Sequence, residues 1–221
     1  MKKTLIVVLI LLMASSGLYA QMSFGGRAGI VFGFNNAAEL GDLGKADPDI
    51  DVSEKMLLNF NAAVYGAFAL SEALSIQAEL NFMINQGYKV EGSFVDSGTT
   101  FPVSGEVYYT SLDIPILVKY SFLNDPLLFG AMVGPHISIP LGKATVYVPS
   151  EGKGEIELDN FATFGFTAGV FAGLPIGPGR LVGDLRFIFD FNAAEIDVVF
   201  FSMEIMKRRA LSLTVGYELS F

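Results

Sequence analysis

The sequence predicts an all-β protein, a closed, antiparallel, eight-stranded transmembrane β-barrel with an up-and-down meander. The chain of 221 residues is 52% hydrophobic, yet beyond residue 20 no apolar run approaches the length of about 18 residues that a transmembrane helix needs. Polar and apolar residues alternate over many segments, and an export signal precedes them. A closed barrel fits all three observations, because it pairs every backbone group between strands and faces lipid on one side.

Residues 1–20 have the layout of a secretory signal peptide. The positive pair Lys2-Lys3 precedes a short apolar run, and the segment ends on a small residue, Ala20. The apolar run is too short to span a bilayer. We expect cleavage after Ala20, with an uncleaved anchor as the alternative. Residues 21–221 then form one domain, the barrel.

The strands are predicted from alternation with a period of two. In residues 74–85, apolar positions such as Leu80 alternate with polar positions such as Glu79, and residues 108–121 and 210–221 behave alike. A helix would scatter these polar residues around its circumference, so strand is the consistent interpretation. The eight predicted strands are 22–34, 57–70, 74–85, 108–121, 127–140, 161–174, 181–192 and 210–221.

The predicted connections alternate in length. The short ones are 71–73, 123–126 and 177–179, and the long ones are 35–56, 91–104, 141–160 and 193–207. Short turns belong on the periplasmic side of such barrels and long loops outside. EGKG, at 151–154, is expected to form the tight turn of an extended hairpin.

Alternation directs a set of charged residues into the barrel. These lumen residues are Arg27, Glu79, Asp113, Lys119, Asp184, Arg186, Asp190 and Glu218. The interior of an eight-stranded barrel is just wide enough to be filled by side chains, and buried charges must pair. We therefore expect a network of salt bridges that plugs the lumen. A narrow or gated ion path through the same residues is the alternative.

His136 is the single histidine, and Ser138 lies two residues further on, so both should face the lumen. A serine and a histidine with a carboxylate can act as a catalytic triad. In barrel enzymes such groups usually lie on the lipid-facing side, where acyl chains arrive. We therefore expect an interior hydrogen-bonding role for both residues, and no enzymatic activity.

Several other classes of function lack support in the sequence. A net charge of −9 argues against nucleic acid as a partner, and the absence of cysteine excludes disulfides and thiolate chemistry. The carboxylates of 47–51 lack the pattern of a calcium loop and are expected to be solvated. Residues 207–209, KRR, are expected either to contact lipopolysaccharide phosphates or to ring the rim. No metal site and no cofactor is expected.

The chain ends in a strand that finishes on an aromatic residue. Tyr217, Leu219 and Phe221 share the outward face, where an exposed phenylalanine meets lipid and costs little free energy. This end resembles the targeting signal of bacterial outer-membrane barrels, whose last strand is amphipathic and ends in Phe. The resemblance implies that the outer-membrane barrel assembly machinery is a partner.

A second resemblance lies in the middle of the chain. SLDIPILVKY (111–120), followed by LLFGAMVGPHISI (127–139), resembles the core of the PorT-like outer-membrane β-barrel family, in which an I/L-P-L/I-L-x-K-Y strand precedes a G-P strand. The resemblance implies a small barrel of the OmpA/OmpX type in the bacterial outer membrane, but no single activity. Pro115 and Pro135 are expected at bulges, because proline cannot donate to a ladder.

These observations predict a monomeric, non-enzymatic outer-membrane protein surrounded by lipid and lipopolysaccharide. It would serve envelope structure or bind at the surface through its extracellular loops. Two alternatives stay open. One is an accessory role in protein secretion or assembly with a dedicated secretion-system partner, which the PorT-like segment suggests. The other is a narrow channel or a carrier for small molecules.

Overall fold

The computed structural model describes nine stretches of the chain. These are residues 22–34, 50–96, 98–123, 125–148, 152–157, 162–192, 194–198, 201–206 and 208–221. The predicted signal peptide, 1–20, lies outside them, as do residues 47–49 of the acidic segment. No helix in the described stretches is long and apolar enough to cross a membrane.

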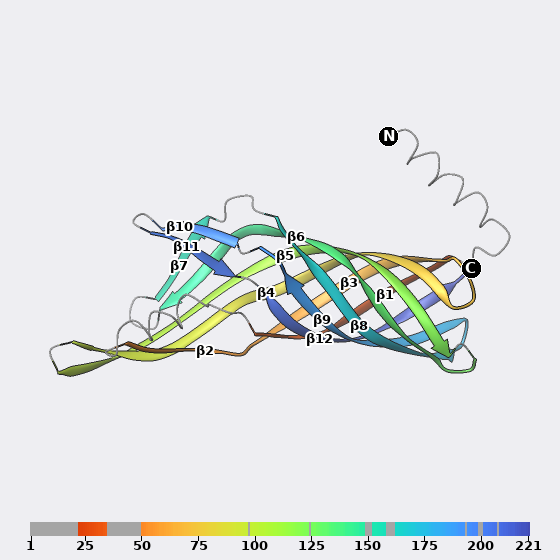
Figure 1. The fold of residues 1–221 in the computed structure, drawn as a ribbon, viewed down its shortest axis with the longest axis horizontal. Helices are drawn as coiled ribbons and strands as arrows, with labels where there is room; N and C mark the ends of the chain where they lie inside the picture. The colour runs from red at the N-terminus through yellow and green to blue at the C-terminus, as the bar shows by residue number, and fades with distance from the viewer. Residues whose placement is uncertain are drawn as a thin grey trace, which may run out of the picture.

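Eight long strands form the wall of the barrel (Figure 1). They are β1 (Met22–Gly33), β3 (Leu57–Ala69), β4 (Leu74–Asp96), β5 (Thr99–Leu123), β6 (Leu128–Val148), β8 (Thr163–Ile176), β9 (Gly179–Asp190) and β12 (Arg209–Ser220). Four shorter strands belong to projecting hairpins. They are β2 (Ile50–Lys55), β7 (Gly152–Glu157), β10 (Ala194–Val198) and β11 (Phe201–Met206).

The wall closes on itself. The strands follow the order β4-β3-β1-β12-β9-β8-β6-β5, and β5 pairs with β4 to complete the ring. β1 and β12, the first and last strands, pair antiparallel from Ser23↔Ser220 to Gly33↔Ala210. The predicted closed, antiparallel, eight-stranded barrel is therefore confirmed, because no barrel strand is left with an unpaired edge.

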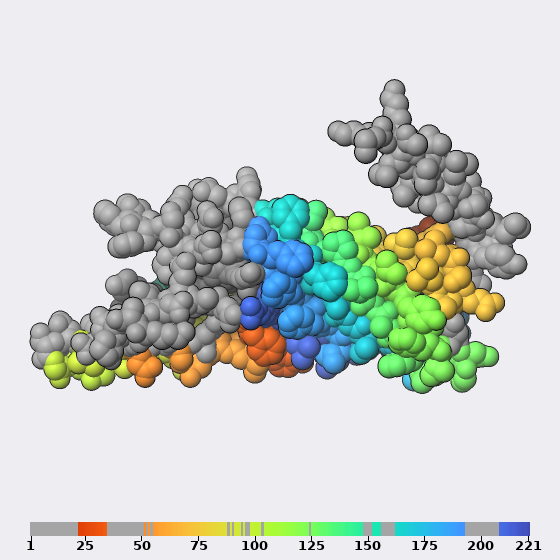
Figure 2. All heavy atoms as spheres, in the orientation of Figure 1, coloured from red at the N-terminus to blue at the C-terminus, as the bar shows by residue number. Residues whose placement is uncertain are grey.

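The two faces of each strand differ as the alternation predicts. On β4, the inward Glu79 is 2% exposed and the adjacent Leu80 is 45% exposed. Side chains cover the visible side of the barrel wall (Figure 2), and large apolar residues are exposed on all eight barrel strands. They form the surface that meets lipid in a membrane barrel.

The short connections lie together at one end of the barrel, where the chain also ends (Figure 1). Residues 70–73 link β3 to β4, and Gly177 with Pro178 links β8 to β9. Gly177 has a φ of 61°, a conformation that glycine adopts without a steric penalty. This end is the periplasmic end by the rule that periplasmic turns are short.

At the other end, the predicted boundaries are wrong, because strands continue where loops were expected. The expected loop at 91–104 is a hairpin in which β4 and β5 stay paired as far as Asp96↔Thr99. Residues 50–55 form β2, which pairs with β4, and β10 pairs with β11. Backbone pairing can continue beyond the bilayer without an apolar face, so these strands give no clear alternation.

The hairpin predicted around EGKG is present, but its turn is not at 151–154. Gly152 already pairs with Val148, so β7 begins there and the connection is 149–151, outside the described residues. Pro115 and Pro135 do not mark bulges either. The β4–β5 pairing lapses beside Pro115 without a change of register, because proline removes a donor but inserts no residue. A bulge lies instead between Met83 and Gln86.

Candidate functional site

All eight predicted lumen charges lie inside the barrel, none more than 9% exposed. Four of them form an inner quartet, defined as Arg27, Glu79, Asp184 and Arg186. Arg27 donates a hydrogen bond to Glu79, and its Nη1 lies 2.7 Å from Asp184 Oδ2. Arg186 Nη1 donates to both Glu79 oxygens at 2.9 Å, and its Nε lies 2.7 Å from Asp184 Oδ1. Two cations therefore balance two anions, which buried charges require.

Lys119 is linked to the quartet through the side-chain amide of Gln77. Its Nζ donates to Gln77 Oε1 at 2.8 Å, and Gln77 in turn donates to Glu79. The Lys119 ammonium also lies 4.3 Å from the centre of the Phe171 ring, within cation–π range. Nearer the periplasmic end, Glu218 Oε1 lies 3.7 Å from Arg180 Nη1.

An outer cluster lies toward the hairpin end, defined as Asp113, His136, Asp190 and Arg208. Arg208 is 3% exposed. Its Nη1 donates to Asp113 Oδ2 at 2.8 Å, and its Nη2 donates to Asp190 Oδ1 at 3.1 Å. One guanidinium therefore serves two carboxylates from different strands.

The expected rim or lipopolysaccharide role of 207–209 is wrong for Arg208. Asp113 and Asp190 provide the physical reason, because both are buried and need a cation. The predicted lumen set holds five acids and three bases, and that imbalance was a signal that a further base enters the barrel. Arg209 differs, lying 5.4 Å from the centre of the Phe189 ring, and residue 207 lies outside the described stretches.

The structure separates His136 from Ser138. His136 Nε2 lies 2.7 Å from Asp190 Oδ1, and His136 Nδ1 lies 3.0 Å from Thr167 Oγ1. Ser138 instead donates to Ser111 at 3.1 Å. The arrangement holds a histidine, a carboxylate and a hydroxyl in contact, but all are buried in the filled lumen. Chemically it is a satisfied hydrogen-bond network.

A small apolar layer separates the two charged clusters. Val31, Met83, Ile188 and Ala210 pack together, each at most 4% exposed. Ile188 lies on β9 between Arg186 of the quartet and Asp190 of the outer cluster. Side chains thus fill this part of the lumen in successive charged, apolar and charged layers. That filling argues against an open pore through the described part of the barrel.

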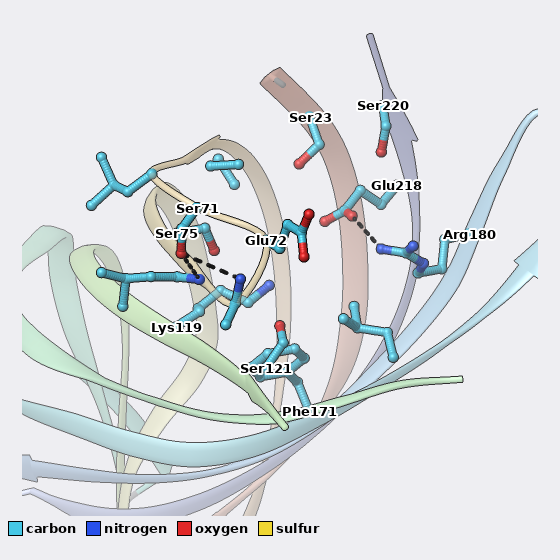
Figure 3. Close-up of a pocket in the computed structure, with 16 residues that line it drawn as sticks. Ser23, Ser71, Glu72, Ser75, Lys119, Ser121, Phe171, Arg180, Glu218 and Ser220 are labelled. Atoms are coloured by element: carbon cyan, nitrogen blue, oxygen red, sulfur yellow. Dashed lines mark hydrogen bonds and ion pairs between the residues drawn. The ribbon is translucent and has the colours of Figure 1, made fainter. Parts of the chain in front are cut away.

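The periplasmic end is hollow by contrast. A cavity of about 700 Å³ opens there, lined by residues from all eight barrel strands and from the turn at 71–73 (Figure 3). Lys119, Arg180 and Glu218 line it together with several serines. Sequence reasoning directed Lys119 and Glu218 inward but gave no sign that space would remain around them.

The last strand completes the wall at this end. Tyr217, Leu219 and Phe221 face outward, with Phe221 76% exposed. The Phe221 amide donates to Met22 O at 2.8 Å, and its ring packs edge-on against Phe24 at 6.3 Å. The terminal residue therefore takes part in closing the barrel against β1.

The β4–β5 hairpin carries its own surface charges beyond the barrel. Lys89 Nζ lies 2.8 Å from Glu91 Oε1 and 3.2 Å from Glu106 Oε1. The hydrogen bond to Glu91, followed by that to Glu106, raises the pKa of Lys89. The same bond from Lys89 lowers the pKa of Glu91. These groups are solvent-exposed, so salt screens them.

Comparison with solved structures returns other outer-membrane proteins. OprG from Pseudomonas aeruginosa aligns with a TM-score of 0.50 at 8% identity, over 90% of this chain and 95% of that one. Neisserial surface protein A aligns with a TM-score of 0.46 at 11% identity, over 90% of this chain and 97% of that one. Ail, the attachment invasion locus protein of Yersinia pestis, aligns with a TM-score of 0.41 at 10% identity, over 90% of this chain and 99% of that one. At 8% identity, the likeness to OprG shows a shared fold alone.

Sequence comparison assigns the family. No curated protein sequence matches the chain. Residues 17–194, well over half of the chain, match the family described as outer membrane protein beta-barrel domain. The family and the closed barrel together locate the protein in the bacterial outer membrane. The chain thus belongs to the outer membrane protein beta-barrel domain family.

Proposed function

We propose that the protein is a non-enzymatic surface-binding protein, in which a plugged barrel anchors hairpins that project from the cell. The observation that carries the proposal is the length of two strands. β4 has 23 residues and β5 has 25, whereas β1, β9 and β12 have 12 each. A transmembrane strand needs only about 9–11 residues, so the hairpin extends about ten residues beyond the bilayer.

Further strands widen the projecting part into a sheet. β2 pairs along β4 from Ile50↔Phe94 to Lys55↔Lys89, and β7 pairs along β6. Paired strands hold a surface in one shape, which lowers the entropy cost of binding a partner. The filled lumen supports the same proposal, because it favours an anchor over a channel.

A secretion accessory is the second candidate. The PorT-like segment 111–120 supports it, because this segment forms the part of β5 that ends at the periplasmic mouth, where Lys119 lines the cavity. A partner for that role would meet the periplasmic end of the barrel and not the hairpins.

Site-specific photo-cross-linking on intact cells tests both candidates. A photoreactive amino acid would replace Thr100 on the exposed hairpin, Ser71 in a periplasmic turn, or Val118 on the lipid-facing wall as the control. The proposal expects a discrete adduct with protein or lipopolysaccharide from position 100 and none of that mass from position 118. An adduct from position 71 alone would contradict the surface-binding proposal and support the secretion role.

Conductance in planar bilayers provides a second readout. The filled lumen predicts no regular current steps from the purified barrel. Reproducible steps that change when Glu79 is replaced by Gln would favour the channel alternative and contradict the anchor role.

A further inference from the structure

The cavity at the periplasmic end has the features of a binding site for a small ligand. Its volume of about 700 Å³ falls within the range of about 300–1,000 Å³ common for small-molecule sites. Its lining includes the turn at 71–73 (Figure 3), and the short turns lie at the end of the barrel opposite the projecting hairpins (Figure 1). A function at this end is therefore independent of the surface-binding role proposed above.

The cavity has a closed inner end. Lys119 forms that end, held by its bond to Gln77 and by its position over the Phe171 ring, with both Lys119 and Phe171 lining the cavity. Beyond Gln77 lies Glu79 of the inner quartet. A ligand could therefore enter from the periplasm and stop at a fixed cation.

The charged side chains of the lining are two cations and two anions, Lys119, Arg180, Glu72 and Glu218. Arg180 Nη1 and Glu218 Oε1 lie 3.7 Å apart, beyond normal hydrogen-bond distance, and Arg180 Nε is buried without a hydrogen-bond partner. Glu218 is 5% exposed and also hydrogen-bonds Tyr65. Serine hydroxyls complete the polar lining. Both signs of charge thus reach one small space.

We propose that this cavity binds a small zwitterion from the periplasm, an amino acid or a short peptide. The ligand carboxylate would lie near Lys119 and Arg180, and its ammonium group near Glu218. Charge-assisted hydrogen bonds of both signs would form at once. A ligand with one sign of charge would satisfy only half of the lining and leave the other charges less well solvated.

Binding to the complete barrel, folded in detergent micelles, tests the proposal. Three probes share one backbone: Ala-Ala, N-acetyl-Ala-Ala without the ammonium group, and Ala-Ala-amide without the carboxylate. Titration calorimetry and ligand-observed NMR should show Ala-Ala binding about tenfold more tightly than either blocked form, a difference of about 1.4 kcal/mol.

Two substitutions should separate the two halves of the ligand. Lys119→Gln should abolish the preference for Ala-Ala over Ala-Ala-amide, and Glu218→Gln should abolish the preference over N-acetyl-Ala-Ala. Lys143→Gln, which lies in β6 toward the hairpin end, is the matched control and should change neither preference. A mobility shift on boiling would verify that each variant is folded.

A cavity-filling variant keeps the proposal testable if Lys119→Gln fails to fold. Ser121 lines the cavity, and Ser121→Trp should eliminate binding of Ala-Ala while the barrel remains folded. Equal binding of all three probes, unchanged binding in Ser121→Trp, or no saturable binding would each overturn the proposal. None of these results would affect the role of the hairpins.

Discussion

Glu79 and Leu80 are neighbours on one strand, yet they are subject to different physical requirements. Glu79 is buried and meets two arginines from β1 and β9, so its position, charge and partners are all specified. Leu80 points to lipid and is 45% exposed in the isolated barrel. Lipid chains are as apolar as leucine and impose no single packing partner. Positions on the inner face therefore require a particular residue, whereas positions on the outer face require only an apolar side chain.

The largest predicted effect comes from breaking the inner quartet. Glu79→Ala removes the carboxylate that Arg27 and Arg186 share and leaves both guanidinium groups short of a partner. Breaking a buried ion pair in this way costs about 3–5 kcal/mol in the free energy of unfolding. Urea titration of the barrel folded in lipid vesicles measures it.

Leu80→Ala is the matched control, a truncation on the opposite face of the same strand. It should cost about 1–2 kcal/mol, the transfer free energy of the lost methyl and methylene groups. If the two truncations cost the same, the distinction between the two faces would be refuted.

A second pair of neighbours tests the outer cluster. Arg208→Met leaves Asp113 and Asp190 without their common cation, and should cost about 3 kcal/mol or more in the free energy of unfolding. Arg209→Met removes a cation–π contact with Phe189 worth about 1 kcal/mol. An equal or larger loss from Arg209→Met would contradict the role of Arg208 as the common cation of Asp113 and Asp190.

Placing a charge on the outer face should have the next largest effect. Leu80→Arg exposes a guanidinium to lipid and should cost about 2–4 kcal/mol if position 80 lies near the bilayer midplane. Leu80→Ile keeps the apolar character and should change stability by less than about 1 kcal/mol. Tolerance of arginine would mean that the wall at β4 does not face lipid.

The end of β12 tests the assembly role proposed for the terminal aromatic residue. Deleting Phe221 removes the hydrogen bond that its backbone N–H donates to the Met22 carbonyl oxygen, and also the ring contact with Phe24. We predict a lower amount of folded barrel in isolated outer membranes, measured by the gel shift on boiling. Leu219→Ile, which preserves the apolar face, is the control. Normal amounts without Phe221 would show that assembly does not use this residue.

The smallest predicted effect concerns the charges of the hairpin. The lowered pKa of Glu91 means that its contribution is present above its unfolded pKa of about 4.3 and is lost as the pH falls. The raised pKa of Lys89 means that its contribution is present below about 10.4 and is lost above. The protection factors of the hairpin amides, which are corrected for the intrinsic pH dependence of hydrogen exchange, should therefore be highest between about pH 5 and pH 10.

High salt should reduce this pH dependence, because exposed pairs are screened. Lys89→Met should lower the protection of the hairpin amides at neutral pH and remove most of its pH dependence, while the barrel amides exchange as before. An unchanged pH profile in Lys89→Met would show that the pairs with Glu91 and Glu106 do not stabilise the hairpin.

The sequence by itself determined the barrel, its eight strands, and which side chains point inward, such as Glu79 and Asp113. The reason is that a period of two, without an apolar run beyond residue 20 long enough for a transmembrane helix, leaves few folds that satisfy the backbone in lipid. Alternation carries no information where both faces meet water. The continuation of β4 to Asp96 therefore depended on backbone pairing that a sequence pattern does not reveal.

Only the tertiary structure decided which inward residues meet. Arg208 lies 95 residues from Asp113 along the chain, and His136 pairs with Asp190 while Ser138, two residues away, bonds Ser111. Inward direction is a local property of a strand, because successive side chains alternate between its faces. Which inward side chains contact one another, and where a cavity remains, depends on the register and closure of all eight strands. Only the closed ring sets the position of each side chain along the barrel axis.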